Sequence, residues 1–134
     1  MVVSRAGWGL VMGLALVAAI AWLALRPAGR VTIGSALTNG TSDATLRVDE
    51  PFRALLTLDR PLAAAGRVHV EVRRMDDDGE RVERDYTARA GKGNDELFIA
   101  FPSTGRVVSS PGTFRVVFLL DGRALGTAWL RVVR

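Results

Sequence analysis

The fold class is decided by the stretch RVHVEVR, residues 67–73, in which polar and apolar residues alternate without a break. On an extended chain the three valines fall on one side, and the charged residues and His69 fall on the other. Such alternation is typical of a β-strand that is buried on one face only. We therefore expect Val68, Val70 and Val72 to face a core, and His69 to face solvent.

Similar short stretches follow one another along the rest of the chain. The expected strands cover residues 30–38, 44–48, 52–58, 67–74, 81–88, 96–101, 113–120 and 123–133. Turn residues separate them at intervals of about eight to twelve residues, which is typical of a β-sandwich. Asp78-Gly79 and Asp121-Gly122 predict tight hairpin turns, because both central positions of such turns favour positive φ. Val82 and Tyr86 are the expected core residues of the strand 81–88.

The region 31–134 is long enough for one domain and too short for two. We expect it to be an all-β, antiparallel β-sandwich of about seven strands. The chain contains no cysteine, which excludes disulfides, thiolate metal sites and a thiol nucleophile. Fifteen of the eighteen basic residues and all fourteen acidic residues follow Arg30, so this region is nearly neutral. No basic stripe with interleaved aromatic residues occurs in it, and we expect no nucleic-acid partner.

Residues 6–25 are uncharged and mostly apolar. As a helix they would be about 30 Å long, which is the thickness of the hydrocarbon core of a bilayer. Trp8 and Trp22 lie near the two ends, where indole side chains prefer the membrane–water boundary. We therefore expect a single membrane-spanning anchor at residues 6–25, between an N-terminal tail of residues 1–5 and a linker of residues 26–30.

Two other interpretations of this apolar segment stay open. Ala19-Ile20-Ala21 fits the small-x-small rule of a signal-peptide cleavage site, although cleavage there would leave apolar residues at the new N-terminus. A buried core helix is the other alternative, although a helix that is apolar all round has no face for water. If the segment is an anchor, Gly9 and Gly13 form a small-xxx-small pair that predicts contact between two such helices.

The orientation of the anchor follows from the lengths of the two flanking parts. The basic residues on the two sides are almost balanced, so the positive-inside rule decides little. A short N-terminal tail with a long folded C-terminal domain usually keeps its N-terminus in the cytoplasm. We therefore expect the β domain to lie outside the cytoplasmic membrane of a bacterium.

The last hairpin carries a resemblance to a known family. It reads PGTFRVVFLLDGR over residues 111–123, followed by Leu125 and by AWLRV over residues 128–132. This pattern resembles the closing strand pair of bacterial immunoglobulin-like domains. The resemblance implies a Greek-key sandwich used for adhesion, spacing or subunit contact, usually outside the cytoplasm. It implies no catalytic residues, and this chain lacks the paired cysteines of antibody-type domains.

The same hairpin predicts a surface patch. If Phe114 and its alternate neighbours point into the core, Arg115, Val117 and Leu119 point outward, and so does Trp129 on the partner strand. Val117, Leu119 and Trp129 would then form an exposed apolar patch, of the kind that marks protein contacts. The alternative is that a β-bulge shifts the register or that a loop covers this face.

Acidic residues gather at the expected turn near residue 78. Asp76, Asp77, Asp78 and Glu80 are candidate calcium ligands, because calcium takes six to eight oxygen ligands. Their spacing is not that of a calcium-binding loop, and a solvated hairpin tip explains them as well. The loop Gly91-Lys92-Gly93-Asn94 could form a small anion-binding nest, but an ordinary inter-strand loop is the better interpretation.

No catalytic constellation emerges from the sequence. His69 is the single histidine, and nothing in the sequence places a serine or an orienting acid beside it. We expect no enzyme activity and no cofactor. The expected function is that of a membrane-anchored module that binds another protein, as an accessory subunit of a cell-envelope complex. The alternative is a module that binds calcium or an envelope glycan through the acidic tip.

Overall fold

The computed structural model describes residues 28–35, 40–101 and 103–134. These residues form eight β-strands and one 3₁₀ turn. The elements are β1 (Gly29–Ser35), β2 (Asp43–Arg47), β3 (Phe52–Leu58), β4 (Gly66–Asp76), β5 (Gly79–Ala90), β6 (Glu96–Phe101), η1 (Thr104–Arg106), β7 (Gly112–Leu120) and β8 (Arg123–Val133). The all-β prediction is confirmed for this part of the chain, and every expected strand is present.

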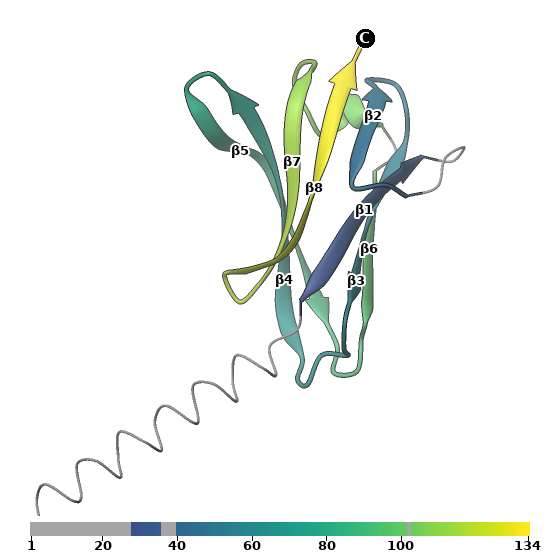
Figure 1. Ribbon diagram of the computed structural model, residues 1–134, viewed down its shortest axis with the longest axis vertical. Helices are drawn as coiled ribbons and strands as arrows, with labels where there is room; N and C mark the ends of the chain where they lie inside the picture. The colour runs from purple at the N-terminus through teal and green to yellow at the C-terminus, as the bar shows by residue number, and fades with distance from the viewer. Residues whose placement is uncertain (1–27, 36–39, 102) are drawn as a thin grey trace, which may run out of the picture.

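The strands form two sheets that pack against each other (Figure 1). The smaller sheet has the order β1-β3-β6, and the larger sheet has the order β2-β8-β7-β4-β5. Neighbouring strands are antiparallel with one exception, because β2 runs parallel to β8. The prediction of a wholly antiparallel sandwich is therefore wrong for this pair. The parallel pairing arises because the chain changes sheets between β1 and β2, and β2 then pairs with the free edge of β8.

The strand order corresponds to that of immunoglobulin-like sandwiches. In the nomenclature of that fold, β1, β3 and β6 take the places of strands A, B and E, and β4, β7 and β8 take those of C, F and G. The remaining strand of the β4–β5 hairpin takes the place of C′. Among the described residues no strand follows it in the D position, so β6 forms an edge of the smaller sheet.

The hydrophobic core lies between the two sheets. Val68, Val70 and Val72 are all buried there, as their alternation predicts. The rings of Phe52 and Phe101 stack with their centroids 4.5 Å apart. The largest fully buried side chains are Phe114, Phe118, Ile33, Leu56 and Leu130.

The two hairpin turns of the larger sheet differ. Asp121 and Gly122 have φ values of 49° and 83°, as expected for a tight turn between β7 and β8. Between β4 and β5 the turn residues are instead Asp77 and Asp78, and Gly79 follows them with a φ of 119°. The prediction of Asp78-Gly79 as the central pair is therefore wrong by one residue. The turn is held by the Asp76 carboxylate, which accepts a hydrogen bond from the amide of Asp78 at 3.0 Å.

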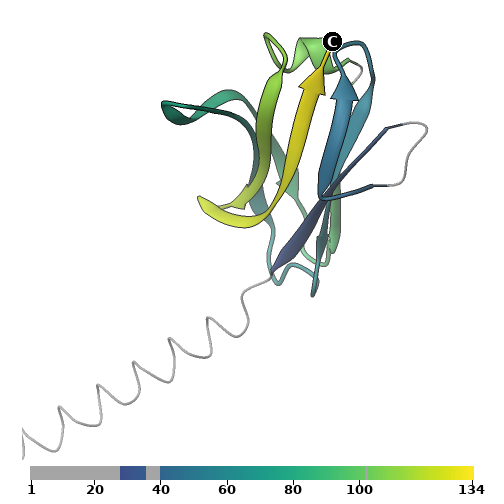
Figure 2. The same ribbon diagram turned by 45° about the horizontal axis from the view of Figure 1, so that its top comes forward.

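The larger sheet is strongly curved. Figures 1 and 2 show that the β4–β5 hairpin and the β7–β8 hairpin both bend away from the smaller sheet, on the same side of the molecule. The outer face of the larger sheet is therefore concave between them. Curvature of this kind brings side chains on that face closer together than they would be on a flat sheet.

Within the described residues no helix is long and apolar enough to cross a membrane. The anchor expected at residues 6–25, the helix contact at Gly9 and Gly13 and residues 26 and 27 of the linker lie outside the described residues. β1 begins at Gly29, so the folded domain starts within the linker expected at residues 26–30.

Candidate functional site

One row of side chains crosses all five strands of the larger sheet on its concave outer face. The register pairs Val82 with Arg73, Arg73 with Arg115, Arg115 with Trp129, and Trp129 with Asp43. We call these five residues the Trp129 row. Trp129 is 43% exposed and Val82 is 51% exposed, so large apolar side chains reach the surface on both sides of the two arginines.

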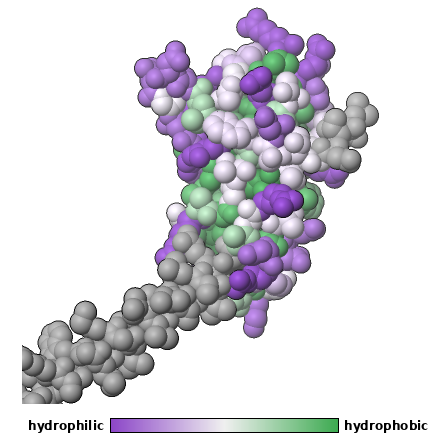
Figure 3. Space-filling view, in the orientation of Figure 1, coloured by the Kyte–Doolittle hydropathy of each residue, from purple (hydrophilic) through white to green (hydrophobic). Residues whose placement is uncertain are grey.

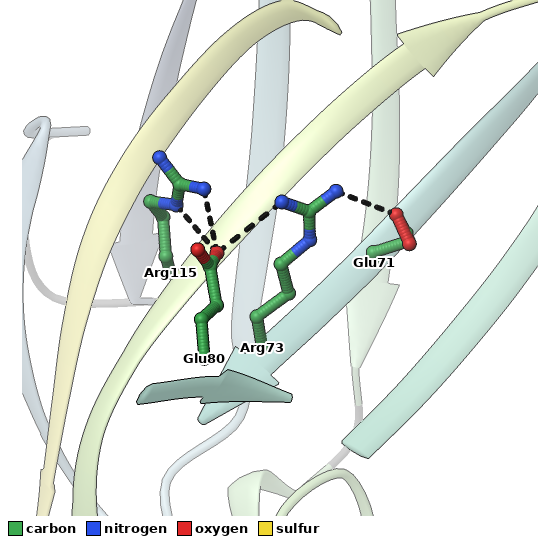
Figure 4. A network of polar contacts seen from close by, with 4 residues as sticks. All are labelled: Glu71, Arg73, Glu80 and Arg115. Atoms are coloured by element: carbon green, nitrogen blue, oxygen red, sulfur yellow. Dashed lines mark hydrogen bonds and ion pairs between the residues drawn. The ribbon is translucent and has the colours of Figure 1, made fainter. Parts of the chain in front are cut away.

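A carboxylate bridges the two arginines of this row (Figure 4). Oε1 of Glu80 lies 3.2 Å from Nη1 of Arg73 and 2.6 Å from Nη2 of Arg115. Glu71 extends the network, since its Oε1 lies 2.8 Å from Nη2 of Arg73. Like charges directly opposite each other on neighbouring strands are destabilising, and the bridging carboxylate offsets that repulsion between Arg73 and Arg115. The network therefore holds both guanidinium groups in place, and Arg115 lies directly opposite Trp129.

The pKa of Glu80 reflects this bridge. Partial desolvation raises the pKa of Glu80, but hydrogen bonds from Arg115 and Arg73 and the charges of both outweigh it. The net effect is a pKa below the ordinary value of 4.5, so the carboxylate stays ionised in weak acid. The pKa of Arg73 is raised, mainly because Arg73 donates a hydrogen bond to Glu71.

The predicted patch of Val117, Leu119 and Trp129 is only partly correct. All three side chains point outward as predicted, but Val117 is 2% exposed and Leu119 is half-buried. Val117 lies at the centre of the concave face, with Glu71 and Thr127 as its cross-strand neighbours. Of the predicted patch, Trp129 alone is well exposed.

The prediction of Val82 as a core residue is wrong. A β-bulge interrupts the register of β4 and β5, because Val72 pairs with Arg84 and the next residue, Arg73, pairs with Val82. Glu83 is the extra residue, and it moves Val82 from the inner face to the outer face. Tyr86 lies beyond the bulge and packs on the core, as expected. No pattern of polar and apolar residues announces the bulge, so the sequence offered no signal for it.

The bulge also creates a buried ion pair. Nε of Arg74 lies 2.9 Å from Oε1 of Glu83, and Arg74 is 8% exposed. Its guanidinium group also donates to the carbonyl and hydroxyl oxygens of Ser110, at 2.9 and 2.8 Å, and stacks 4.5 Å from the ring centroid of Phe114. The alternation of residues 67–73 places Arg74 on the inner face, so its inward direction could have been predicted from the sequence. This pair fastens the connection between β6 and β7 to the β4–β5 hairpin.

The four acidic candidates near residue 78 are not gathered into one group. Among the residues described, no group of three or more His, Asp or Glu side chains could hold a metal ion. Of the four candidates, Asp76 accepts a hydrogen bond inside the turn, and Glu80 is bound to two arginines. Asp77 and Asp78 are exposed at the tip, where hydrophilic residues gather at the upper left of Figure 3. A solvated hairpin tip therefore describes these residues.

His69 and the loop at residues 91–94 show no chemistry of their own. His69 lies on the outer face, where its Nδ1 atom is 3.2 Å from the hydroxyl oxygen of Thr87. In the loop, the amide of Gly93 donates to the carbonyl oxygen of Leu62 at 2.8 Å, and Asn94 donates to Gly91 at 3.2 Å. These two amides are occupied within the protein and do not form an anion-binding nest.

The sandwich has a second exposed aromatic residue, which the sequence analysis did not single out. Phe98 is 72% exposed on the outer face of the smaller sheet, opposite Leu55 of β3. Both phases of β6 are apolar, so alternation does not predict which phase is buried.

A cavity of about 180 Å³ opens between β5 and β6. Its lining includes Val68, Val70, Tyr86, Leu97, Ile99 and Phe118.

No protein-family model matches the chain, and no curated protein matches it significantly. An immunoglobulin-like protein from Pseudomonas aeruginosa superposes with a TM-score of 0.45 at 15% identity, over 81% of this chain and 92% of that one. A β-glucosidase from Listeria innocua in complex with gluconolactone gives 0.45 at 10% identity, over 79% of this chain and 16% of that one. The CARDB domain of a Pyrococcus furiosus protein in complex with two metal ions gives 0.39 at 14% identity, over 80% and 94%. The fold assignment rests on the strand order of the chain itself.

Proposed function

We propose that this protein is a non-catalytic, membrane-anchored module of a bacterial cell envelope, which binds another protein through the Trp129 row. In this proposal residues 6–25 span the cytoplasmic membrane and the β-sandwich lies on its outer side. The observation that carries the binding role is the exposed indole of Trp129 in one row with two arginines that ion pairs hold in place.

The composition of this row supports a protein partner. Tryptophan and arginine are enriched among the residues that dominate protein–protein binding energy. Binding costs less conformational entropy when the side chains are already fixed, and Glu80 fixes both arginines of the row. The concave outer face would surround a convex partner surface on two sides, with the β4–β5 and β7–β8 hairpins as its margins (Figure 2).

A crosslinking pull-down from native membranes tests the binding surface. Full-length tagged protein is compared with Trp129→Ala and with Phe98→Ala, which removes an exposed aromatic from the opposite sheet. We expect the yield of a specific crosslinked protein to fall at least tenfold with Trp129→Ala and to stay unchanged with Phe98→Ala. The reverse pattern would place the partner on the smaller sheet and contradict the proposal.

The membrane part is tested separately. The full-length protein should stay with the membrane fraction through an alkaline carbonate wash, because the wash releases peripheral proteins and a spanning helix stays inserted. Protease added to spheroplasts should digest the β-sandwich, and protease added to intact inside-out vesicles should leave it untouched. Digestion only in the inside-out vesicles would show that the domain faces the cytoplasm.

A further inference from the structure

The first described residue is fastened to one end of the sandwich. The amide of Ala28 donates to Oδ1 of Asp59 at 3.0 Å, and the carbonyl oxygen of Ala28 accepts from the amide of Asp59 at 2.9 Å. β1 then begins at the next residue, with Gly29 paired to Leu58. Ala28 is therefore held to the folded domain.

The predicted anchor ends only a short distance before this point. Its last apolar residue is Leu25, so residues 26 and 27 alone connect it to Ala28. Three Cα–Cα steps span at most about 11 Å when fully extended. The polar headgroup layer on each side of a bilayer is about 5–8 Å thick. The length of this connection alone therefore limits how far Ala28 can lie from the headgroup layer.

Two loops lie beside Ala28 at the same end of the sandwich. We call residues 59–65 and 91–95 the proximal loops. Hydrogen bonds join them, since Leu62 donates to the carbonyl oxygen of Asn94 at 2.9 Å and accepts from Gly93 at 2.8 Å. Apart from Leu62 every residue in them is exposed, and most are small or uncharged. Figure 1 shows this end opposite the C-terminus.

We infer that the proximal loops lie directly on the headgroup layer of the bilayer, as a consequence of the short connection. This inference rests on the proposed membrane anchor. The exposed alanines 63–65 allow close approach to the lipid surface. The loops carry no net charge that would repel anionic headgroups, since Arg60 and Lys92 balance Asp59 and Asp95. The domain is thus seated on the membrane and is not carried on a flexible stalk.

Contact between the proximal loops and the bilayer would set the distance of the proposed binding surface from the membrane. β4 starts at Gly66, next to the proximal loops, and Arg73 follows seven residues later. At about 3.3 Å per residue the Trp129 row lies about 20–25 Å from the loops. A partner would therefore have to present its surface at that distance from the membrane.

The absence of cysteine from the chain allows a sharp test. Ala64→Cys places a single thiol in a proximal loop, and Asp77→Cys places one at the distant tip of the β4–β5 hairpin. Each full-length variant is labelled with a fluorophore and reconstituted in phosphatidylethanolamine–phosphatidylglycerol vesicles that contain a nitroxide-headgroup lipid in both leaflets. We expect quenching at residue 64 to exceed that at residue 77 at least about threefold, because nitroxide quenching requires near contact.

Equal quenching at the two positions, in vesicles that retain the protein through a carbonate wash, would contradict the contact between the proximal loops and the bilayer. It would leave the proposed anchor standing. Loss of the protein in that wash would overturn both. A third variant carries ten Gly/Ser residues between Pro27 and Ala28, which adds an average reach of about 17 Å. Quenching at residue 64 should then fall by at least half, and unchanged quenching would show that the short connection does not hold the loops on the membrane.

Discussion

Glu80 and Arg115 are in contact although a whole strand separates them. Oε1 of Glu80 on β5 lies 2.6 Å from Nη2 of Arg115 on β7, across the intervening β4. The contact braces the β4–β5 hairpin against the centre of the sheet. Both side chains keep more than a quarter of their surface exposed, so solvent screens the interaction.

Glu80→Gln should therefore destabilise the protein by about 0.5–1 kcal/mol, since it leaves Arg73 and Arg115 opposed without a bridging charge. Urea unfolding of the detergent-solubilised full chain measures this change. Asp77→Asn is the matched control, because it removes an acidic charge three residues away on the exposed tip. Equal effects of the two substitutions would show that general charge, and not the bridge, is responsible.

Stability should fall in acid, and two glutamates should account for part of the fall. The pKa of Glu83 lies below 4.5, because hydrogen bonds from Arg74 and Ser109 outweigh the opposing effect of desolvation. The pKa of Glu80 is lowered as well. A carboxylate with a lowered pKa in the folded state stabilises the protein above the unfolded-state value and loses that effect as the pH falls.

The loss should begin near the unfolded-state value of about 4.5 and continue below it. Melting temperatures measured from pH 7 to pH 3 test this, with Glu80→Gln and Glu83→Gln beside the parent. Each substitution should lower the melting temperature at pH 7 and flatten its decline below pH 5. Parallel curves for all three proteins would contradict the assignment.

Arg74 should be the most sensitive charged residue of the domain. Arg74→Ala removes the partner of a largely buried carboxylate, and breaking such a pair typically costs about 3–5 kcal/mol. Arg81→Ala is the matched control, since Arg81 is the exposed register neighbour of Arg74 on β5. We expect the control to change the free energy of unfolding by less than about 0.5 kcal/mol. Similar losses for the two variants would mean that the ion pair adds nothing beyond surface charge.

The strands could be predicted because a strand that is buried on one face alternates between apolar and polar residues. Residues 67–73 show this most clearly, and the position of the Asp121-Gly122 turn was predicted as well. The register of the last hairpin does not follow from that turn alone, because it shifts between Phe118 and Leu119. The parallel pairing of β2 and β8 could not be predicted in this way. It joins segments more than eighty residues apart, and no local pattern records which distant edge a strand joins.

The candidate site was less predictable for two physical reasons. A one-residue bulge at Glu83 reverses the face of Val82, and a bulge leaves the composition of a strand unchanged. The exposure of a side chain on a concave face depends on the curvature of the whole sheet, and Val117 is buried there although it points outward. Alternation gave the direction of Trp129 correctly, because direction is a local property and exposure is not.

Val117 and Trp129 should therefore respond in opposite ways to the same substitution. Val117→Arg forces a charged side chain into a covered position and should destabilise the protein by more than about 2 kcal/mol. Trp129→Arg leaves the new charge at the surface and should cost less than about 1 kcal/mol. Thermal melting distinguishes the two, since 1 kcal/mol corresponds to about 4–8 °C in a domain of this size. Comparable losses would mean that Val117 is accessible to solvent. The sequence-based prediction of an exposed patch of Val117, Leu119 and Trp129 would then be correct.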